Sequence, residues 1–149
     1  MSTHREIGRV VKLPPPAPGF LGEGHTAVTV VDASEFARND PFIVLMDDRL
    51  DLPDGREAGG AHPHSGFETV TFVLEGALRD RDEGTLGTGD VLWMTAGSGV
   101  IHNENVVPLG RSRVLQLWLT SRRRAVSCAR RFRAGGSRFV QRVFICIGG

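Results

Sequence analysis

The chain has 149 residues, a length that favours one domain with a hydrophobic core of its own. Its hydrophobic share of 40% is ordinary for a soluble globular protein, and its two cysteines are too few for a disulfide framework. No apolar run reaches the roughly 20 residues of a membrane helix, and the first residues lack an apolar signal-peptide core. We therefore expect a cytoplasmic protein that binds no membrane.

The net charge of +1 hides a strong asymmetry along the chain. Residues 1–104 carry all 17 acidic residues and eight basic ones, whereas residues 105–149 carry ten arginines and no acidic residue. A basic end of this kind can bind nucleic acid or an acidic partner. It can also mean that the two parts of the chain differ in origin.

Short segments with the alternation or the β-branched composition of strands follow one another along the chain: Thr26–Val31, Phe42–Met46, Phe67–Leu74, Val91–Thr95 and Val114–Leu119. Turn-forming clusters separate them: Pro14–Gly24, Leu52–Gly60, Asp80–Gly89 and Ala96–Gly99. A short helix is compatible with Ser34–Asn39, and the apolar run Phe139–Ile147 could add a strand. Short strands between many tight turns predict an all-β barrel or sandwich.

Two short motifs carry the chemistry of the chain: His62-Pro63-His64 and His102-Asn103-Glu104. Each motif places metal-ligand types at positions i and i+2, which point to the same face of a strand. Two such strands side by side would aim three imidazoles and one carboxylate at one point. That ligand set suits Fe(II), Mn, Ni, Cu or Zn, and it leaves positions open on an octahedral ion.

A single His-x-His pair is about as well explained by ordinary hydrogen bonds as by a metal. The second motif changes this balance, because it repeats the spacing and follows the glycine-rich bend Ala96–Gly99, which lets a strand re-enter a barrel closely. The sequence thus favours a metal centre inside a β-barrel. The remaining histidines, His4 and His25, are expected at the surface.

The residues around these motifs resemble the pirins, a branch of the cupin superfamily. The resemblance is carried by HPHSGFETVTFVLEG at residues 62–76 and GDVLWMTAGSGVIHNE at residues 89–104, with Leu-Gln-Leu-Trp at 115–118 and weaker similarity at Asp-Pro-Phe 40–42. It implies an all-β fold with a single cupin barrel (a double-stranded β-helix or jelly roll) over residues 1–120. It also implies one metal ion, usually iron, on His62, His64, His102 and Glu104.

Four further residues are expected beside the metal or on the pocket wall: Glu68, Trp93, Met94 and Phe72. Glu68 lies at an even spacing from His62 and His64, so one regular strand would turn it to their face. Many other cupins place a carboxylate ligand there, but in pirins that ligand is the later carboxylate, here Glu104. We therefore interpret Glu68 as a supporting or structural residue. Trp93 and Met94 are strand neighbours, so they cannot both face the pocket.

The chain also departs from the pirin pattern. Pirins usually carry arginine where this chain has Ser65 and Ser98, and the loss of both cations would weaken contacts to an anionic substrate. Pirins contain two cupin domains in tandem, and only the first has a counterpart here. Residues 121–149 resemble no part of the family. A basic tail that binds nucleic acid is one interpretation, and a shifted reading frame that cut a longer protein short is the one we favour.

The resemblance allows two functions. The first is a metal-dependent dioxygenase that cleaves flavonols such as quercetin, a quercetin 2,3-dioxygenase, in which Glu104 would accept the proton of the flavonol hydroxyl. Dioxygen would open the activated ring with release of carbon monoxide. The second is a non-enzymatic, redox-responsive iron protein that binds a transcription factor or a metabolic enzyme; a remnant that binds metal poorly is a third reading. An exposed barrel edge would favour a homodimer.

Overall fold

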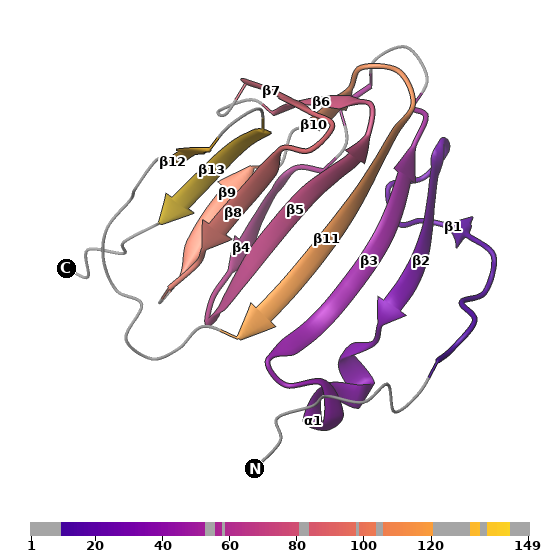
Figure 1. Ribbon diagram of the computed structural model, residues 1–149, viewed down its shortest axis with the longest axis vertical. Coiled ribbons are helices and arrows are strands. Elements are labelled where there is room, and N and C mark those ends of the chain that lie inside the picture. The colour runs from indigo at the N-terminus through magenta and orange to yellow at the C-terminus, as the bar shows by residue number, and fades with distance from the viewer. Residues whose placement is uncertain are drawn as a thin grey trace.

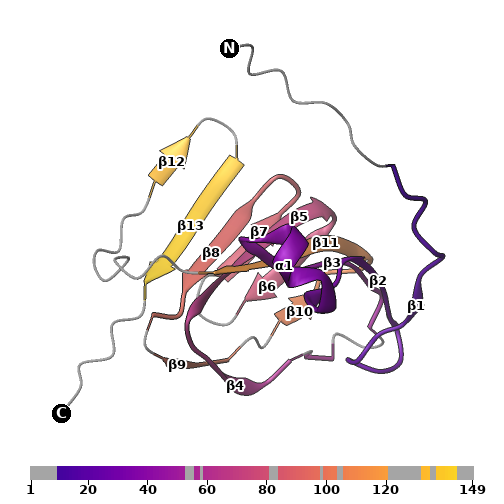
Figure 2. The same cartoon turned by 90° about the horizontal axis from the view of Figure 1, so that it is seen from below.

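The computed structural model describes residues 10–52, 56–57, 59–80, 84–97, 99–103, 106–120, 132–134 and 137–143. These residues form one large curved sheet and two smaller sheets, and the curvature folds the strands into a barrel (Figures 1 and 2). The predicted all-β barrel is confirmed.

The large sheet has the strand order β1-β2-β3-β11-β5-β8-β13-β12. Its strands are β1 (Ala17–Pro18), β2 (His25–Val31), β3 (Phe42–Leu50), β5 (Phe67–Glu75), β8 (Val91–Thr95), β11 (Ser112–Thr120), β12 (Phe132–Ala134) and β13 (Ser137–Val143). A three-stranded sheet joins β6 (Ala77–Asp80), β7 (Gly84–Gly87) and β10 (Val106–Pro108). A two-stranded sheet pairs β4 (Ala61–His64) with β9 (Val100–Asn103).

The segments predicted as strands all occur as strands of the large sheet, each within two residues of its predicted start. The predicted helical segment is also present, as the 3-10 turn η1 (Ala33–Glu35) followed by α1 (Phe36–Asn39). Asp32 caps this turn, because its carboxylate accepts a hydrogen bond of 2.8 Å from the Ser34 backbone N–H. The turn cluster Asp80–Gly89 was too broad a prediction, since it contains β7 and the end of β6.

Alternation along the central strands separates the inside of the barrel from its outside. Alternate residues line the interior: Asp48 and Leu50 on β3, and Val114, Gln116 and Trp118 on β11. The core of the barrel consists of Leu50, Val73, Leu78, Leu86 and Val114, which are all buried. Burying one such side chain stabilises the fold by about 1.5–3 kcal/mol, so this cluster is a principal source of stability.

The basic region of the chain is described only in part. Its segment Ser137–Val143 forms β13, which pairs in parallel with β8, and the short β12 pairs with β13. The predicted strand Phe139–Ile147 overlaps β13, and the rest of that prediction lies outside the described residues. No helix in the described part of the chain is long and apolar enough to cross a membrane.

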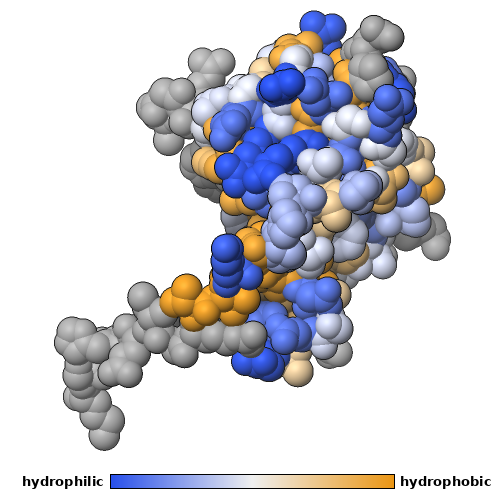
Figure 3. All heavy atoms as spheres, turned by 90° about the vertical axis from the view of Figure 1, so that its right-hand side faces the viewer, coloured by the Kyte–Doolittle hydropathy of each residue, from blue (hydrophilic) through white to orange (hydrophobic). Residues whose placement is uncertain are grey.

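The face that carries β1 and β2 mixes hydrophilic and hydrophobic side chains (Figure 3). Large apolar side chains are exposed in the segment that leads into these strands, among them Val10, Val11 and Phe20. This segment turns back on itself at Gly22 and Gly24, both with positive φ, before β2 begins.

Candidate metal centre and its cavity

The two histidine motifs lie on paired strands. In the antiparallel β4–β9 ladder, His62 is directly opposite His102 and His64 is opposite Val100. Directly opposed positions of an antiparallel pair share one face of the sheet. Pro63 and Ile101, the opposed pair between them, belong to the other face, and Ile101 is 78% exposed there. The register therefore brings positions 62, 64 and 102 to one face of this small sheet.

His62 has a defined ring orientation. Its Nδ1 lies 2.7 Å from the backbone carbonyl oxygen of Gly60. A carbonyl oxygen only accepts hydrogen bonds, so Nδ1 carries the proton and donates it. In the neutral ring, Nε2 then holds a lone pair that can bind a metal, and a carbonyl contact of this kind is the usual support for a metal-ligating histidine. His62 also lines a cavity in the barrel.

His64 is packed among aromatic rings. It is buried, and its ring centroid lies 4.5 Å from that of His62, 5.0 Å from that of Phe67 and 5.5 Å from that of Trp118. Phe67 and Trp118 stack on one another at 4.9 Å. Edge-to-face packing of this kind restricts the ring of His64 and keeps it beside His62.

The other two predicted ligands lie outside what the structure describes: the side chain of His102 and the whole of Glu104. Among the side chains that it does describe, no group of three or more His, Cys, Asp or Glu converges in a metal-binding arrangement. The position of Ser98 also lies outside the described residues, whereas Ser65 is exposed at the end of β4.

Glu68 does not share the face of the histidines, contrary to the expectation from its spacing. The chain does not run on as one regular strand: β4 ends at His64, and Gly66 has φ +76° at a bend before β5 begins. Thr71 on β5 lines the cavity, so Glu68, at an odd spacing from it, belongs to the other face. There the buried Glu68 carboxylate accepts a hydrogen bond of 2.7 Å from the Trp93 indole N–H.

The remaining predicted pocket residues divide between the two faces of the large sheet. Phe72 and Trp93 belong to the face of Glu68, because in the β5–β8 register Val70 opposes Trp93 and Thr71 opposes Leu92. Their predicted place on the pocket wall is therefore wrong. Met94 is buried on the inner face, opposite Thr69. The prediction that Trp93 and Met94 face opposite ways agrees with this register.

The barrel contains a cavity of about 720 Å³ that is open to solvent at one side. This volume falls within the range of about 300–1,000 Å³ that is usual for small-molecule sites. Most of its wall is apolar and includes Leu50, Leu92 and Trp118, and its polar groups include His62, Thr71 and Gln116. Arg56 and Glu57, in the segment before β4, line it as well. The cavity is therefore large and apolar enough for an aromatic ligand that can reach His62.

His25 is buried, not at the surface as the sequence suggested. The residue is 2% exposed, Nδ1 accepts a hydrogen bond of 3.1 Å from the Leu21 backbone N–H, and Nε2 lies 2.9 Å from Asp48 Oδ1. Because Nδ1 accepts, Nε2 carries the proton and donates to Asp48. Asp48 lines the cavity. Nothing local in the sequence signals this contact, because its partners are 23 residues apart.

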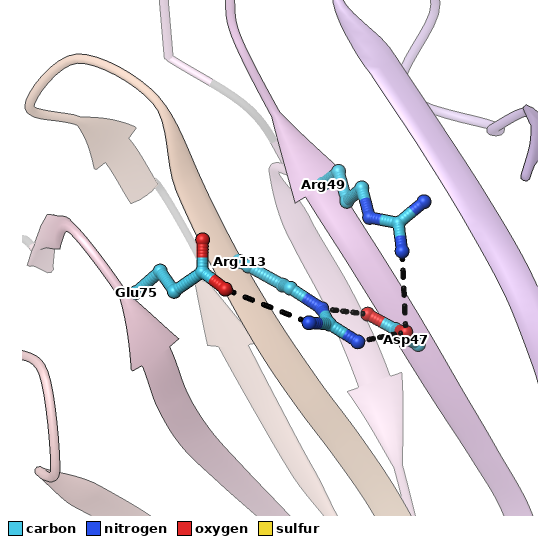
Figure 4. A network of polar contacts seen from close by, with 4 residues as sticks. All are labelled: Asp47, Arg49, Glu75 and Arg113. Carbon is cyan, nitrogen blue, oxygen red and sulfur yellow. Dashed lines mark hydrogen bonds and ion pairs between the residues drawn. The ribbon is translucent and has the colours of Figure 1, made fainter.

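The outer face of the same strands carries a network of charged side chains (Figure 4). Asp47 accepts hydrogen bonds of 2.8 and 2.7 Å from Arg113, which also lies 3.5 Å from Glu75, and Arg49 lies 3.8 Å from Asp47. The hydrogen bonds from Arg113 lower the pKa of Asp47; burial opposes this effect, and the charges of Arg113 and Arg49 add to it. The same hydrogen bonds raise the pKa of Arg113.

Comparison with known proteins agrees with this architecture. A family model described as Pirin matches residues 26–119. A pirin-like protein of Solanum lycopersicum is 40% identical over 102 residues, which cover 66% of this chain and 34% of that protein. The chain spans about a third of the length of the curated relatives it matches.

Two solved structures are similar in fold. A quercetin 2,3-dioxygenase from Acinetobacter baumannii superposes with a TM-score of 0.52 at 32% identity, over 68% of this chain and 40% of that one. The bacterial pirin YhhW from Escherichia coli, solved in complex with nickel(II), superposes with a TM-score of 0.55 at 23% identity, over 75% of this chain and 50% of that one.

Proposed function

Because the chain belongs to the pirin family, we propose that it binds one divalent metal ion, Fe(II) before Mn, Ni, Cu or Zn, through His62, His64, His102 and Glu104. The observation that carries this proposal is the geometry of His62. Its Nδ1–H is held by the Gly60 carbonyl, so Nε2 is the ring nitrogen through which it would bind a metal, and position 102 is directly opposite it in the ladder. Three imidazoles and a carboxylate match the chemistry of such an ion.

We propose further that the chain acts on a flavonol-type aromatic substrate, as a dioxygenase. When bound, the ion would supply Lewis acidity and open positions for a chelating pair of substrate oxygens. The apolar walls around Leu92 and Trp118 would hold the rings and exclude water. Glu104, as a ligand beside the bound substrate, would accept the proton of the substrate hydroxyl. Dioxygen would be consumed, and the ring would open with loss of carbon monoxide.

The alternative is a regulator that responds to the redox state of its iron and binds a protein partner. Such a protein needs the same ligands, but it needs no room for a substrate. The cavity of about 720 Å³, with His62 in its wall, favours the enzyme. The similarity to a quercetin 2,3-dioxygenase over part of that protein supports the choice of substrate class.

One experiment tests both parts of the proposal. The protein is purified without oxygen, loaded with Fe(II), and analysed for metal content. Quercetin and oxygen are then added, and the loss of flavonol absorbance and the release of carbon monoxide are followed. About one metal ion per chain with turnover is the expected result. Metal without turnover would support the regulator instead, and an apoprotein under iron-replete conditions would overturn both.

A further inference from the structure

The cavity contains a buried carboxylate that the proposed reaction does not use. Asp48, on β3, lines the cavity beside the apolar side chains of Leu50 and Val114, and its side chain is 11% exposed. The two oxygens of a carboxylate together offer about four lone pairs, so they can accept hydrogen bonds from several donors at once. A carboxylate that lines a ligand cavity can therefore accept a charge-assisted hydrogen bond from the ligand in addition to its bond from the protein.

The sheet register separates Asp48 from the level of His64 along the barrel. Trp118 on β11 lies at the same height along the barrel as His64, since their ring centroids are 5.5 Å apart. Asp48 is opposite Val114, four residues away from Trp118 on the same strand. At about 3.3 Å per residue, four residues span about 13 Å along β11. A ligand that touches both ends must be elongated, as a three-ring flavonol is.

His25 fixes the orientation of the Asp48 carboxylate. Its Nε2–H donates to Asp48 Oδ1, while the Leu21 backbone N–H holds its Nδ1. Gly19 makes room for this ring, because a Cβ at position 19 would overlap it. The carboxylate is thus held by a buried, neutral imidazole whose own position is set by the backbone. A carboxylate that is held in this way loses little rotational freedom when a ligand binds.

The middle of the cavity is suited to flat rings. Thr71 and Gln116 are opposite one another on β5 and β11, between the level of Trp118 and that of Asp48. Leu92 is opposite Thr71 on β8, on the same inner face. The wall between the two ends therefore carries the aliphatic side chain of Leu92 and two uncharged polar side chains.

We infer that Asp48 is a second anchor of the substrate site, which accepts a hydrogen bond from a hydroxyl group at the end of an aromatic ligand remote from the metal-chelating oxygens, with His25 as its positioning residue. This inference rests on the proposed function for the class of ligand. It defines that class more narrowly: a flavonol with at least one hydroxyl on an outer ring. An unsubstituted flavonol would keep the chelating end and lose the second anchor.

A purely structural role is the alternative, in which Asp48 only ties His25 and the Gly19–Gly24 turn to β3. The two roles differ in what they predict for ligands. If Asp48 is only structural, its substitution should change the affinity for every ligand by the same factor, or for none. An anchor would change only the binding of ligands that carry the remote hydroxyl.

The test compares two ligands and three proteins. Quercetin carries hydroxyls on both outer rings, whereas 3-hydroxyflavone carries only the chelating pair of oxygens. The dissociation constant of each is measured by quenching of tryptophan fluorescence, without oxygen, in the wild type, Asp48→Asn and Asp47→Asn. Asp47 is the matched control, because it is the adjacent aspartate on the outer face. Asp48→Asn keeps an acceptor oxygen for His25, and circular dichroism checks its fold.

We expect the wild type to bind quercetin more tightly than 3-hydroxyflavone, and Asp48→Asn to remove most of this preference by weakening quercetin binding about ten-fold. Asp47→Asn should keep the preference. If Asp48→Asn does not fold, His25→Gln is measured in its place and should reduce the preference in the same direction. The inference is overturned if the preference is unchanged, if Asp47→Asn reduces it equally, or if neither ligand binds.

These outcomes are distinct from failure of the proposed function. Binding of both ligands without turnover would reject the dioxygenase and leave the second anchor standing. Turnover by the wild type, together with an unchanged preference for quercetin in Asp48→Asn, would support the dioxygenase and reject the second anchor.

Discussion

Asp47 and Asp48 are neighbours in the sequence with identical side chains, yet their side chains lie on opposite faces of β3. Asp47 faces outward into a network of arginines, and Asp48 faces the cavity beside His25. The strand period of two residues alone accounts for this division. We therefore expect substitution of Asp47 to change the stability of the fold, and substitution of Asp48 to change ligand binding.

Replacing Asp47 should lower the stability of the fold in a way that depends on pH. The pKa of Asp47 in the folded state lies below its ordinary value of 3.8, so the unfolded state binds a proton more readily. Ionised Asp47 therefore contributes its full stabilisation at pH values above 3.8, the ordinary pKa. This stabilisation is lost as the pH falls through the lower pKa of Asp47 in the folded state. We expect Asp47→Asn to reduce the free energy of unfolding by about 1–2 kcal/mol at pH 7.

Urea unfolding of the wild type and Asp47→Asn at pH 7 and at pH 3 measures this effect. The difference between the two proteins should shrink at the lower pH. A difference that stays constant across this interval would mean that the ion pairs of Asp47 contribute nothing to it.

The histidines of the candidate metal centre and the nearby glutamate should respond differently to substitution. We expect His64→Ala to remove stable metal binding, because it deletes one of the proposed ligands. Glu68→Gln should leave the metal content unchanged, since Glu68 belongs to the other face of the sheet and pairs with Trp93. Elemental analysis after iron loading measures both. An empty site in Glu68→Gln would show that the carboxylate ligand has been misassigned.

At the scale of elements, the glycine between β5 and β6 controls how closely two turns approach. Gly76 has φ +76°, and a Cβ there would overlap the backbone carbonyl of Arg111. Gly110 has a similar φ of +82°, but no atom lies within 4 Å of the position of its Cβ. An alanine at position 110 would therefore meet only the cost of the backbone conformation. An alanine at position 76 would meet the same cost and a steric clash as well.

We expect Gly110→Ala to cost about 1–2 kcal/mol, which is the penalty of the left-handed conformation. Gly76→Ala should cost at least about 1 kcal/mol more, because the Arg111 backbone must also move. Thermal or urea unfolding of the two variants measures the difference. An equal loss of stability in both variants would mean that the backbone at Arg111 can move aside at no cost in free energy.

The sequence predicts the long strands well, because their apolar alternation is local. It does not reveal the hairpin of β6 and β7, since this lies in a stretch of glycine and charged residues that is typical of a turn. Glu68 was assigned to the wrong face because spacing is counted along a regular strand, and the bend at Gly66 interrupts it. The burial of His25 depends on Asp48, a partner that only the folded sheet brings near.

At the scale of the whole molecule, bound metal should stabilise the barrel. The proposed ligands come from β4 and from the region of β9, so an ion would link two strands far apart in the sequence. A ligand that binds only the folded state stabilises it by mass action. We expect iron loading to raise the melting temperature by about 5–10 °C and a chelator to reverse this. His64→Ala should show no such shift, and a shift of equal size in that variant would contradict the assignment.

The position of β11 in the sheet has a consequence for how the protein is made. This strand lies between β3 and β5 and hydrogen-bonds to both, yet it follows both of them in chain order. While a ribosome is still synthesising the residues before Ser112, β3 and β5 each have an unpaired edge. Exposed edges of nascent chains pair readily with other strands. Until β11 emerges, these two edges are therefore the places where the growing chain is open to mispairing with another strand.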